Sequence, residues 1–558
     1  MPEHEWTTLT EVIRQETETG PTDETKHLRV RCGIYSMRNQ SGRYTIRIRL
    51  PAGALLPEQL AVVAEIVERD SRMGVAHLTT RQGIEISDVP GERVAAIARQ
   101  LEAAGLTTRR TGGNVVRGIV SCPWAGVASD EVFDVTPYAL AVDQHLRDHP
   151  AFQRMPRKIK ISFESCQHDH VRTAVADIGL RATVRDGQPG FRITVGGGLG
   201  AVPKLAQPLE DFTPVAAMLP SLDAILRVFD AHGNRQSRAR ARLKWLLTDW
   251  GIERFRDAVF AERASGQVAP VSVPDVLETP PADWPSIARS IIVNGFAEWR
   301  AGNVRPQKQA GYVAVLVRCP LGELSPAQLR RLAAAARMFS GGIRTTIEQD
   351  VLLRWVPAPA LPDLYEFLRP EGLATCCAEQ IMDITRCAGA ERCLSAITNS
   401  KAAAKAIATV GANGLSHEPA VRSLRIRVSG CPNACSHHHA ADIGLFGVSK
   451  KAHGRPAPHY ALLLGGATTG HTFAQRIADV PACRVPEAVQ RVLKLYLATR
   501  TSDEPFPAFV QRIGAPALRT ALASLTPVPP PSTGPEYFRD LDATADFAVE
   551  AKEGECHF

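Results

Sequence analysis

The sequence predicts an α+β fold built by internal duplication. Short stretches of the 558-residue chain recur at a nearly constant shift of 267 to 269 residues. The matching stretches are 50–60 with 319–329, 79–82 with 346–349, 105–106 with 372–373, 158–162 with 425–429, and 195–197 with 464–466. A period of this length is too long for a solenoid and indicates two copies of a two-part unit, related by a pseudo-twofold axis. Each copy also begins with a strand pattern followed by a helix pattern, as α+β units do.

The first copy opens with a strand and a helix. Over residues 44–50 the apolar side chains of Tyr44, Ile46 and Ile48 alternate with polar ones, which is the period of a strand. Pro57 suits the first turn of a helix, whose apolar stripe consists of Leu60, Val63, Ile66 and Val67. A second strand and a helix over residues 94–104 complete a ferredoxin-like half.

The second copy repeats this pattern. Ser325 is a plausible N-cap, Pro326 is the first helical residue, and Gly341 and Gly342 are expected to end the helix. Its apolar stripe consists of Leu329, Leu332, Ala333, Ala336 and Phe339. We expect the two ferredoxin-like halves to pair into one domain, with a larger α+β domain following each half.

The predicted organisation has six parts. They are a first ferredoxin-like half over 27–108, an α+β domain over 109–270, a linker region over 271–307, a second ferredoxin-like half over 308–373, an α+β domain over 374–500, and a C-terminal extension over 501–558. The extension is set apart by the proline-rich stretch 527–531 and a polar tail that ends in Cys556, expected to be an exposed thiol.

Bulk composition is that of an ordinary globular protein, with 44% apolar and 22% charged residues. The net charge of +7 comes without a long Lys/Arg run, so nucleic acid is not an expected partner. An acidic electron donor, an anionic cofactor or substrate, or simply a solvated basic surface would each account for it. The N-terminus lacks the apolar core of a signal peptide, and no stretch reaches 18 uninterrupted apolar residues, so we expect no membrane span. Twelve cysteines in a chain of this length do not indicate a secreted disulfide scaffold, and we expect a cytoplasmic protein.

Four cysteines form two close pairs, Cys387-x5-Cys393 and Cys431-x3-Cys435. Four thiolates suit an iron–sulfur cluster, because sulfur donors stabilise tetrahedral iron and delocalise its charge. Structural zinc fits the spacing less well, since its paired cysteines usually stand two to four residues apart. Buried structural thiols remain a third possibility. The other cysteines are expected to be small buried hydrophobic residues: Cys122, Cys166, Cys319, Cys376 and Cys377.

Lys158-Ile159-Lys160 is a second candidate site. If the segment is a strand, both ammonium groups project from one face, roughly 7 Å apart, while Ile159 and Ile161 anchor the other. Such a pair forms either a solvated edge or an anion site. Consecutive His437, His438 and His439 would alternate between two faces of a strand, so they are not expected to form a metal site. The glycines 196–198 lack the G-x-G-x-x-G order of a dinucleotide site.

Together these motifs resemble the siroheme-containing sulfite and nitrite reductases, over about residues 28 to 515. The most specific element is the four-cysteine signature with Gly430-Cys431-Pro432-Asn433-Ala434-Cys435. The resemblance implies a siroheme and a [4Fe–4S] cluster held by Cys387, Cys393, Cys431 and Cys435, with the Cys435 thiolate also bound to the siroheme iron. It also implies that residues 109–270 form the siroheme and substrate domain and that residues 374–500 carry the cluster.

In this family four cations bind the substrate, and their matches in this chain are Arg47, Arg117, Lys158 and Lys160. Siroheme has eight carboxylates, and a buried pocket must supply many cations and donors to offset their desolvation. The residues expected to do this by resemblance are Arg81, Gln82, Arg157, Arg242, Lys244 and Asn433. Two departures stand out. Glu85 replaces a frequent Gln and would repel the cofactor unless it is protonated or turned away. Tyr35 matches a tyrosine that some relatives crosslink to a cysteine, but no cysteine lies between Cys32 and Cys122.

The resemblance implies an assimilatory sulfite reductase that reduces sulfite to sulfide with six electrons. Nitrite reduction to ammonia is the alternative; plant-type nitrite reductases have Asn where Lys160 stands, although some bacterial ones keep the lysine. A cobalamin-pathway oxygenase of related fold and a non-catalytic siroheme or iron–sulfur electron carrier are further alternatives, and the complete set of four cations argues against both. No flavin or nucleotide domain is evident, so a separate donor, ferredoxin or a flavoprotein subunit, is expected.

Overall fold

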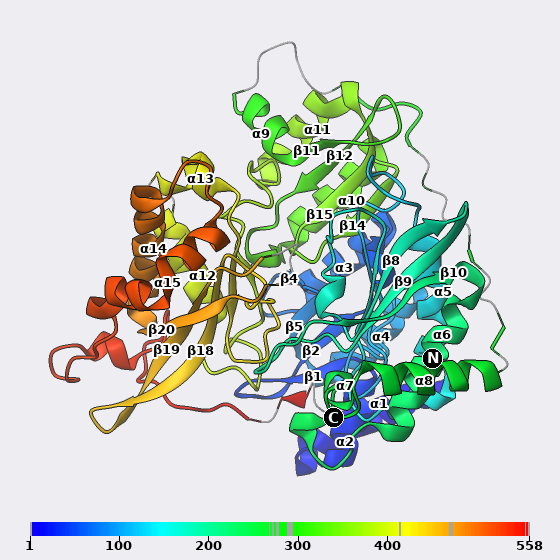
Figure 1. Cartoon of the computed structure of the whole chain (residues 1–558), viewed down its shortest axis with the longest axis horizontal. Coiled ribbons are helices and arrows are strands. Elements are labelled where there is room, and N and C mark those ends of the chain that lie inside the picture. Colours follow the sequence, from blue (N-terminus) through cyan, green and yellow to red (C-terminus); the bar gives the residue numbers. More distant parts are fainter. Residues whose placement is uncertain are drawn as a thin grey trace.

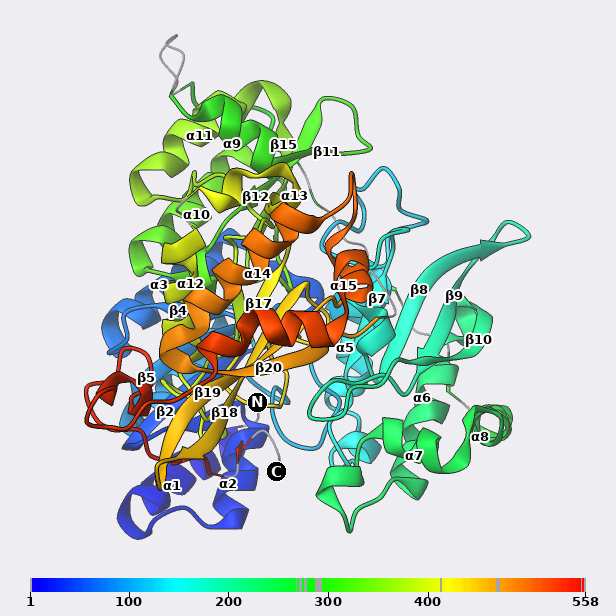
Figure 2. The same cartoon turned by 60° about the vertical axis from the view of Figure 1, so that its left-hand side comes forward.

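The computed structural model describes residues 3–266, 268–269, 273–274, 278, 280–286, 294–411, 414–467, 472–552 and 554–555. Within these residues the strands form four sheets of five strands each, with helices packed against them (Figures 1 and 2). The sheets come in two related pairs, so the predicted α+β duplication is confirmed. None of the described helices is both long enough and apolar enough to cross a membrane.

The two ferredoxin-like halves have matching sheets. The first has the order β1 (Ile34–Met37), β2 (Gln40–Ile48), β5 (Ile84–Pro90), β4 (Ala76–Leu78) and β13 (Glu323–Leu324). The second has the order β11 (Val304–Pro306), β12 (Tyr312–Val317), β15 (Val351–Pro357), β14 (Gly342–Thr345) and β3 (Ala54–Leu55). Their helices are α3 (Pro57–Asp70) and α4 (Gly91–Ala103) in the first, and α10 (Pro326–Phe339) and α11 (Leu361–Leu368) in the second, with α9 (Phe296–Asn303) leading into β11.

Each half lends a two-residue strand to the sheet of the other. Leu55 of β3 pairs with Ile343 of β14, and Glu323 of β13 pairs with His77 of β4. The turn before each short strand has the same unusual backbone, with φ of +56° at Ala52 and +58° at Leu321. Helices α3 and α10 then pack against each other in one shared core. The halves are therefore joined by exchanged strands as well as by packing.

The predicted starts of α3 at Pro57 and of α10 at Pro326 are confirmed, whereas α4 begins at Gly91 rather than at Val94, and two predicted ends are wrong. Ser325 caps α10 by accepting a hydrogen bond from the backbone N–H of Gln328. The helix ends at Phe339 with Ser340 as its C-cap, whereas Gly342 already opens β14. Strand β2 ends at Ile48, because the chain turns at residues 51–53 to reach the other half.

The two larger α+β units also share one topology. The first sheet has the order β10 (Gln207–Pro214), β9 (Gln188–Val195), β8 (Ile178–Arg185), β7 (Ile161–Glu164) and β6 (Val120–Ser121). The second has the order β16 (Thr385–Arg386), β17 (Ile426–Ser429), β18 (Ile443–Ala452), β19 (Arg455–Leu464) and β20 (Gln475–Pro481). In both, the first three strands along the chain are parallel and the rest antiparallel.

Helices complete these two units. They are α5 (Thr136–Arg147), α6 (Val215–His232), α7 (Leu243–Trp250) and α8 (Ile252–Ser265) in the first, and α12 (Ser400–Gly411), α13 (Pro419–Arg422), α14 (Val485–Thr499) and α15 (Phe506–Leu522) in the second. Phe506, Phe509 and Leu518 of α15 belong to the core of the second unit, so packing continues beyond residue 500. Two N-terminal helices, α1 (Glu3–Thr19) and α2 (Asp23–Arg31), lie beside α4 and β1.

Candidate functional site

A large cavity opens where the first ferredoxin-like half meets both α+β units. It encloses about 1530 Å³ between the side chains, part of it open to solvent. Its charged lining is strongly positive, with two carboxylates, Glu85 and Glu555, against eight cations: Arg47, Arg49, Arg81, Arg117, Lys158, Lys160, Arg386 and Arg392. All four cysteines of the signature line the same cavity: Cys387, Cys393, Cys431 and Cys435.

The cysteines are placed by the ends of two short parallel strands. Cys387 directly follows β16, and the loop carrying Cys431 and Cys435 follows β17. The backbone N–H of Gly430 donates to the Cys387 sulfur at 3.1 Å. A Cβ at Gly430 would lie 2.6 Å from the carbonyl oxygen of Thr398, so this turn requires glycine.

The thiols differ in their surroundings. Burial, together with the neighbouring Cys435 and Cys387, raises the pKa of Cys431. Cys435 is exposed, and it lines the cavity. An exposed cysteine beside three further thiols is an unusual surface feature, but it fits a sulfur donor aimed at a bound group. Four thiols on one wall are a donor set that suits an iron–sulfur cluster.

Lys158 and Lys160 face the cavity from an extended segment. Ile159 forms an isolated parallel bridge with Val116, and regular strand β7 begins only at Ile161, so the predicted strand is shorter than expected. Ile159 and Ile161 are fully buried, which turns both lysines to the opposite side. Burial, with Arg81 and Arg242 nearby, lowers the pKa of Lys160 to about 7.

Arg47 and Arg117 also line the cavity, and the backbone N–H of Arg117 donates to the carbonyl oxygen of Ile159, between the two lysines, at 2.9 Å. Arg47 donates to Glu85 at 2.7 Å and to the Tyr35 hydroxyl at 3.1 Å. Glu85 is therefore turned toward the Arg47 guanidinium. This ion pair offsets the charge with which Glu85 was expected to repel the siroheme carboxylates. Arg117 is buried and donates to the carbonyl oxygens of Thr111 and Gly113 at 2.7 and 2.8 Å.

Two of the predicted cofactor-binding residues also line the cavity. Arg81 donates to the carbonyl oxygen of Gly118, and burial, with Arg117 nearby, lowers its pKa to about 9. Asn433 lies on the cysteine loop and is exposed. Thr80 donates to the carbonyl oxygen of Cys435 at 2.7 Å, which ties the loop of the first half to the cysteine wall.

The other four predicted cofactor-binding residues lie outside the cavity lining. Gln82 is fully buried and bonds to the backbones of Ser121 and Thr345. Lys244 donates to the carbonyl oxygens of residues 198, 199 and 202. Arg157 donates to Asn114 at 3.0 Å, and Arg242 pairs with Asp177 at 2.6 Å. Arg242, together with Lys160, lines a smaller neighbouring pocket. A binding role for these four side chains stays a prediction.

Several residues of the cavity had no clear signal in the sequence. Arg386 and Arg392 share the carboxylate of Glu323, each at 2.6 Å. Glu555, from the C-terminal tail, pairs with buried Arg29 at 2.7 Å and accepts from the backbone N–H of Ser36. These partners lie far apart along the chain, so neither spacing nor a motif links them.

Cysteines outside the site were predicted to be buried. Cys122, Cys166 and Cys319 are, but Cys376 and Cys377 are partly exposed, so that prediction is wrong for the latter two. Cys556 lies outside the described residues. His437 lies beside Arg172, and the rings of His438 and His439 contact each other.

The cavity therefore joins a four-thiol wall to a dense set of cations. Such a lining suits an iron–sulfur cluster beside a polyanionic ring and a small anion. These are the features of a redox enzyme built around two coupled prosthetic groups.

Comparison with known proteins also indicates a redox enzyme with two prosthetic groups. The chain matches the "Nitrite and sulphite reductase 4Fe-4S domain" over residues 112–268 and 377–527. It matches the "Nitrite/Sulfite reductase ferredoxin-like half domain" over residues 35–104 and 305–370. The chain therefore belongs to the nitrite and sulfite reductase family, whose cofactors, siroheme and a [4Fe–4S] cluster, are its cofactors.

Relatives cover most of the chain. A ferredoxin–nitrite reductase of Synechococcus elongatus is 30% identical over 475 residues, which span 83% of this chain and 88% of that protein. An assimilatory ferredoxin-dependent nitrite reductase of Haloferax mediterranei is 30% identical over 514 residues, 87% and 85% of the two chains. Among solved structures, the Mycobacterium tuberculosis NirA protein superposes with a TM-score of 0.78 at 25% identity, covering 92% of this chain and 95% of the other.

Proposed function

We propose that this chain reduces nitrite to ammonia with six electrons taken from ferredoxin. The observation that carries the proposal is the meeting of four thiols and the cations Arg47, Arg117, Lys158 and Lys160 in one cavity. In this proposal the cluster would be held by Cys387, Cys393, Cys431 and Cys435, and Cys435 would also serve as the thiolate ligand of siroheme. The relatives described above are named as ferredoxin-dependent nitrite reductases, which supports nitrite and ferredoxin. A cytoplasmic location stays a prediction.

Sulfite reduction to sulfide is a second candidate, and Lys160 favours it. Plant-type nitrite reductases of this family have Asn at this position, and an added ammonium suits a substrate that can arrive as a dianion. A flavoprotein subunit would be the other possible donor. The names of the relatives do not support the preference for sulfite that the sequence suggested. We therefore rank sulfite below nitrite as the proposed substrate.

When bound, the two cofactors supply the iron at which the anion binds and the electrons that reduce it. The four cations of the chain would then bind and orient the anion through charge-assisted hydrogen bonds. Reduction consumes protons as each oxygen leaves, so groups that hold protons beside the anion are needed. Lys160 is suited to this role, because burial lowers its pKa to about 7 and makes its ammonium a ready acid. Arg47 and Arg117 would act on the anion through their charge.

Parallel assays on the loaded enzyme test the substrate. With a chemically reduced donor, we expect nitrite to give at least about tenfold higher kcat/KM than sulfite, which corresponds to about 1.4 kcal/mol in the barrier. Ammonia and sulfide are measured as products, and the assay is repeated with reduced ferredoxin. A kcat/KM for sulfite equal to or above that for nitrite would move the proposal to sulfite. If protein with full siroheme and cluster content reduces neither anion, the proposal that it is a nitrite or sulfite reductase is refuted.

The rate should fall as the pH rises through the pKa of Lys160. The ammonium form exists below this pKa, which burial lowers to about 7, so the proton donor is lost on the alkaline side. Lys160→Arg keeps the charge at all working pH values and should remove the alkaline limb of kcat/KM. Lys158→Arg serves as the matched control. An unchanged alkaline limb in Lys160→Arg, with both cofactors bound, would show that another group titrates.

A further inference from the structure

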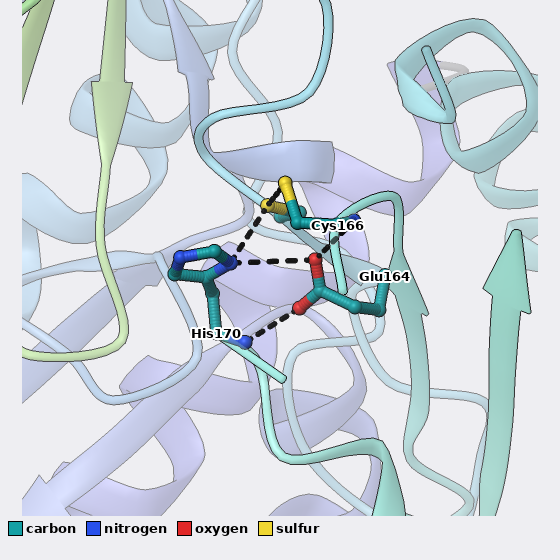
Figure 3. Close-up of side chains that lie close together, drawn as sticks. Glu164, Cys166 and His170 are labelled. Carbon is teal, nitrogen blue, oxygen red and sulfur yellow. Dashed lines mark hydrogen bonds and ion pairs between the residues drawn. The ribbon is translucent and has the colours of Figure 1, made fainter. Parts of the chain in front are cut away.

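A second cluster of soft ligands lies outside the cavity, in the first α+β unit. Ligand atoms of Cys122, Glu164, Cys166 and His170 all lie within 4.8 Å of one another. Figure 3 shows the side chains of Glu164, Cys166 and His170 pointing toward one another at the end of β7. Cys122, Glu164 and Cys166 are buried, and His170 is partly exposed.

The distances within this cluster are those between the corners of a small tetrahedron. The sulfurs of Cys122 and Cys166 are 3.7 Å apart, the Cys122 sulfur is 3.5 Å from Nδ1 of His170, and this nitrogen is 3.4 Å from Oε1 of Glu164. Zinc bonds of about 2.3 Å to sulfur and about 2.0–2.1 Å to nitrogen and oxygen, at tetrahedral angles, give separations of about 3.8, 3.5 and 3.3 Å for the same pairs. These three pairs of atoms therefore already stand at the separations of a zinc site, and the remaining pairs of the set lie within 4.8 Å.

The internal duplication relates this cluster to the cysteine wall of the cavity. The paired residues Ile161 and Ile178 of β7 and β8 correspond to Ile426 and Ile443 of β17 and β18, a shift of 265 residues. This is two fewer than the 267 at which the sequence pattern pairs residues 158–162 with 425–429. The same shift carries Cys122, Cys166 and His170 onto Cys387, Cys431 and Cys435.

Backbone contacts confirm the equivalence. The N–H of Cys122 donates to the carbonyl oxygen of Phe163 at 2.9 Å, just as the N–H of Cys387 donates to that of Val428 at 3.1 Å. The shift carries Ala128 onto Cys393, so the first unit lacks a counterpart of the fourth thiol. Glu164 supplies a donor from another position instead.

We propose that Cys122, Cys166, His170 and Glu164 bind a single Zn²⁺ ion, at the site related by pseudo-symmetry to the iron–sulfur cluster. Two thiolates, an imidazole and a carboxylate form a tetrahedral set that zinc accepts. A cubane is excluded as occupant because the set has only two thiols and too small a separation between them. The site would be structural, since it ties the ends of β6 and β7 together.

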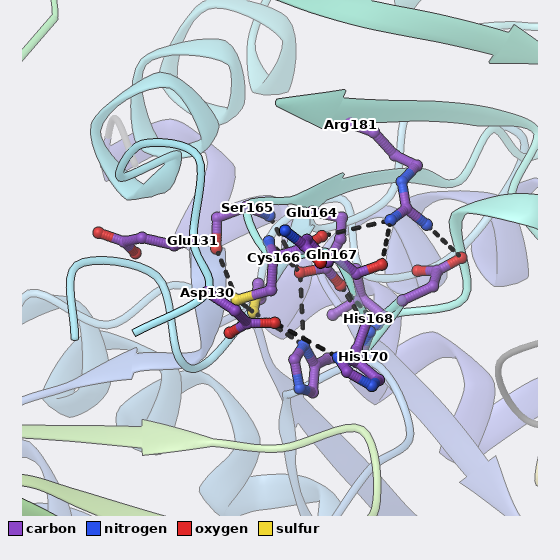
Figure 4. A network of polar contacts seen from close by, with 12 residues as sticks. Asp130, Glu131, Glu164, Ser165, Cys166, Gln167, His168, His170 and Arg181 are labelled. Atoms are coloured by element: carbon purple, nitrogen blue, oxygen red, sulfur yellow. Dashed lines mark hydrogen bonds and ion pairs between the residues drawn. The ribbon is translucent and has the colours of Figure 1, made fainter. Parts of the chain in front are cut away.

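Surrounding groups hold the four donors in place. The carboxylate of Glu164 accepts hydrogen bonds from the backbone N–H groups of Ser165, Cys166 and His170. Arg181 donates to the carbonyl oxygens of Cys166 and Gln167, which fixes the loop (Figure 4). Glu164 is fully buried, and within the described part of the chain its ion-pair partner is His170 rather than a lysine or arginine. His170 and these backbone N–H groups compensate the Glu164 carboxylate, and a divalent cation would compensate it together with the two neighbouring thiolates.

X-ray absorption at the zinc edge tests the site directly, because it is blind to the iron of the two cofactors. Cells that produce the enzyme with its siroheme and cluster are grown with added Zn²⁺. The protein is purified anaerobically without a metal-affinity tag and passed over chelating resin. We expect about one zinc per chain, with about two sulfur neighbours at 2.3 Å and about two nitrogen or oxygen neighbours at 2.0–2.1 Å. Cys122→Ser/Cys166→Ser should lose this zinc and keep its iron, whereas Cys319→Ser, another buried thiol, should keep both.

Each other outcome overturns the proposal. Protein without zinc, protein with another ion at this site, or a zinc spectrum without sulfur neighbours would each do so. A disulfide between Cys122 and Cys166 found by mass spectrometry in the anaerobic protein would mean a redox pair instead. If the Cys122→Ser/Cys166→Ser variant keeps its full zinc content, the zinc is bound at another site. If the double variant does not fold, the single variant His170→Asn replaces it. Loss of the zinc from this variant, with the sulfur neighbours seen in the wild-type spectrum, supports the proposal, and full zinc retention contradicts it.

Discussion

Cys387→Ser should leave the protein without its cluster and lower the rate of anion reduction by about a thousandfold or more. Serine replaces a soft thiolate with a hard hydroxyl, and electrons that must cross the cluster then have no path. The structural basis is the position of Cys387 at the end of β16, where the N–H of Gly430 already points at its sulfur. Iron content, visible absorption and the rate with a reduced donor are the measurements.

Replacing each of the four cysteines should remove the cluster, but the effect on the siroheme spectrum should differ between them. Cys393→Ser should match Cys387→Ser, while Cys435→Ser should also disturb the siroheme bands, because Cys435 is the thiol exposed toward the cavity. Cys319→Ser is the control, since its buried sulfur lies outside the cavity and should leave iron content unchanged. Full cluster content in Cys387→Ser, or loss of the cluster in Cys319→Ser, would show that the ligands are misassigned.

Lys160→Asn should separate the two anions. The change keeps a hydrogen-bond donor but removes one positive charge from a partly buried position that lines the cavity. Losing one charge-assisted hydrogen bond in a desolvated site costs about 1.5–3 kcal/mol, or roughly ten- to a hundredfold in rate. We expect a fall of this size for sulfite and a smaller one for nitrite, because sulfite can carry two charges and must shed one more oxygen. Both kcat/KM values are measured on protein with full siroheme and iron content.

The matched control is Lys450→Asn, which removes the same charge from a half-exposed ion pair with Asp479. It should leave both rates unchanged. Equal losses for nitrite and sulfite in Lys160→Asn would mean that this lysine serves anion reduction in general. An unchanged sulfite rate would remove the main argument for sulfite as the second candidate.

The duplication, the starts of α3 and α10 and the four-cysteine signature could be predicted from the amino-acid sequence alone. Helix starts could be predicted because caps act within one turn; Ser325, Pro326 and Gln328 are neighbours, and the capping box they form is local. The duplication was visible because both copies keep their turn and strand residues. Helix ends were less certain, since Gly342 serves a strand and an unremarkable Ser340 ends α10.

Which distant residues meet becomes visible only in the folded chain. The exchanged strands β3 and β13 have two residues each, too few for any periodicity to show. The pairing of Arg47 with Glu85 and of Arg29 with Glu555 joins side chains whose spacing carries no signal. Nothing in the sequence links Cys122, Cys166 and His170, whereas the pairing of the equivalent parallel strands shows that they match Cys387, Cys431 and Cys435. Local patterns encode elements over a few residues, whereas a site depends on packing that brings together segments hundreds of residues apart.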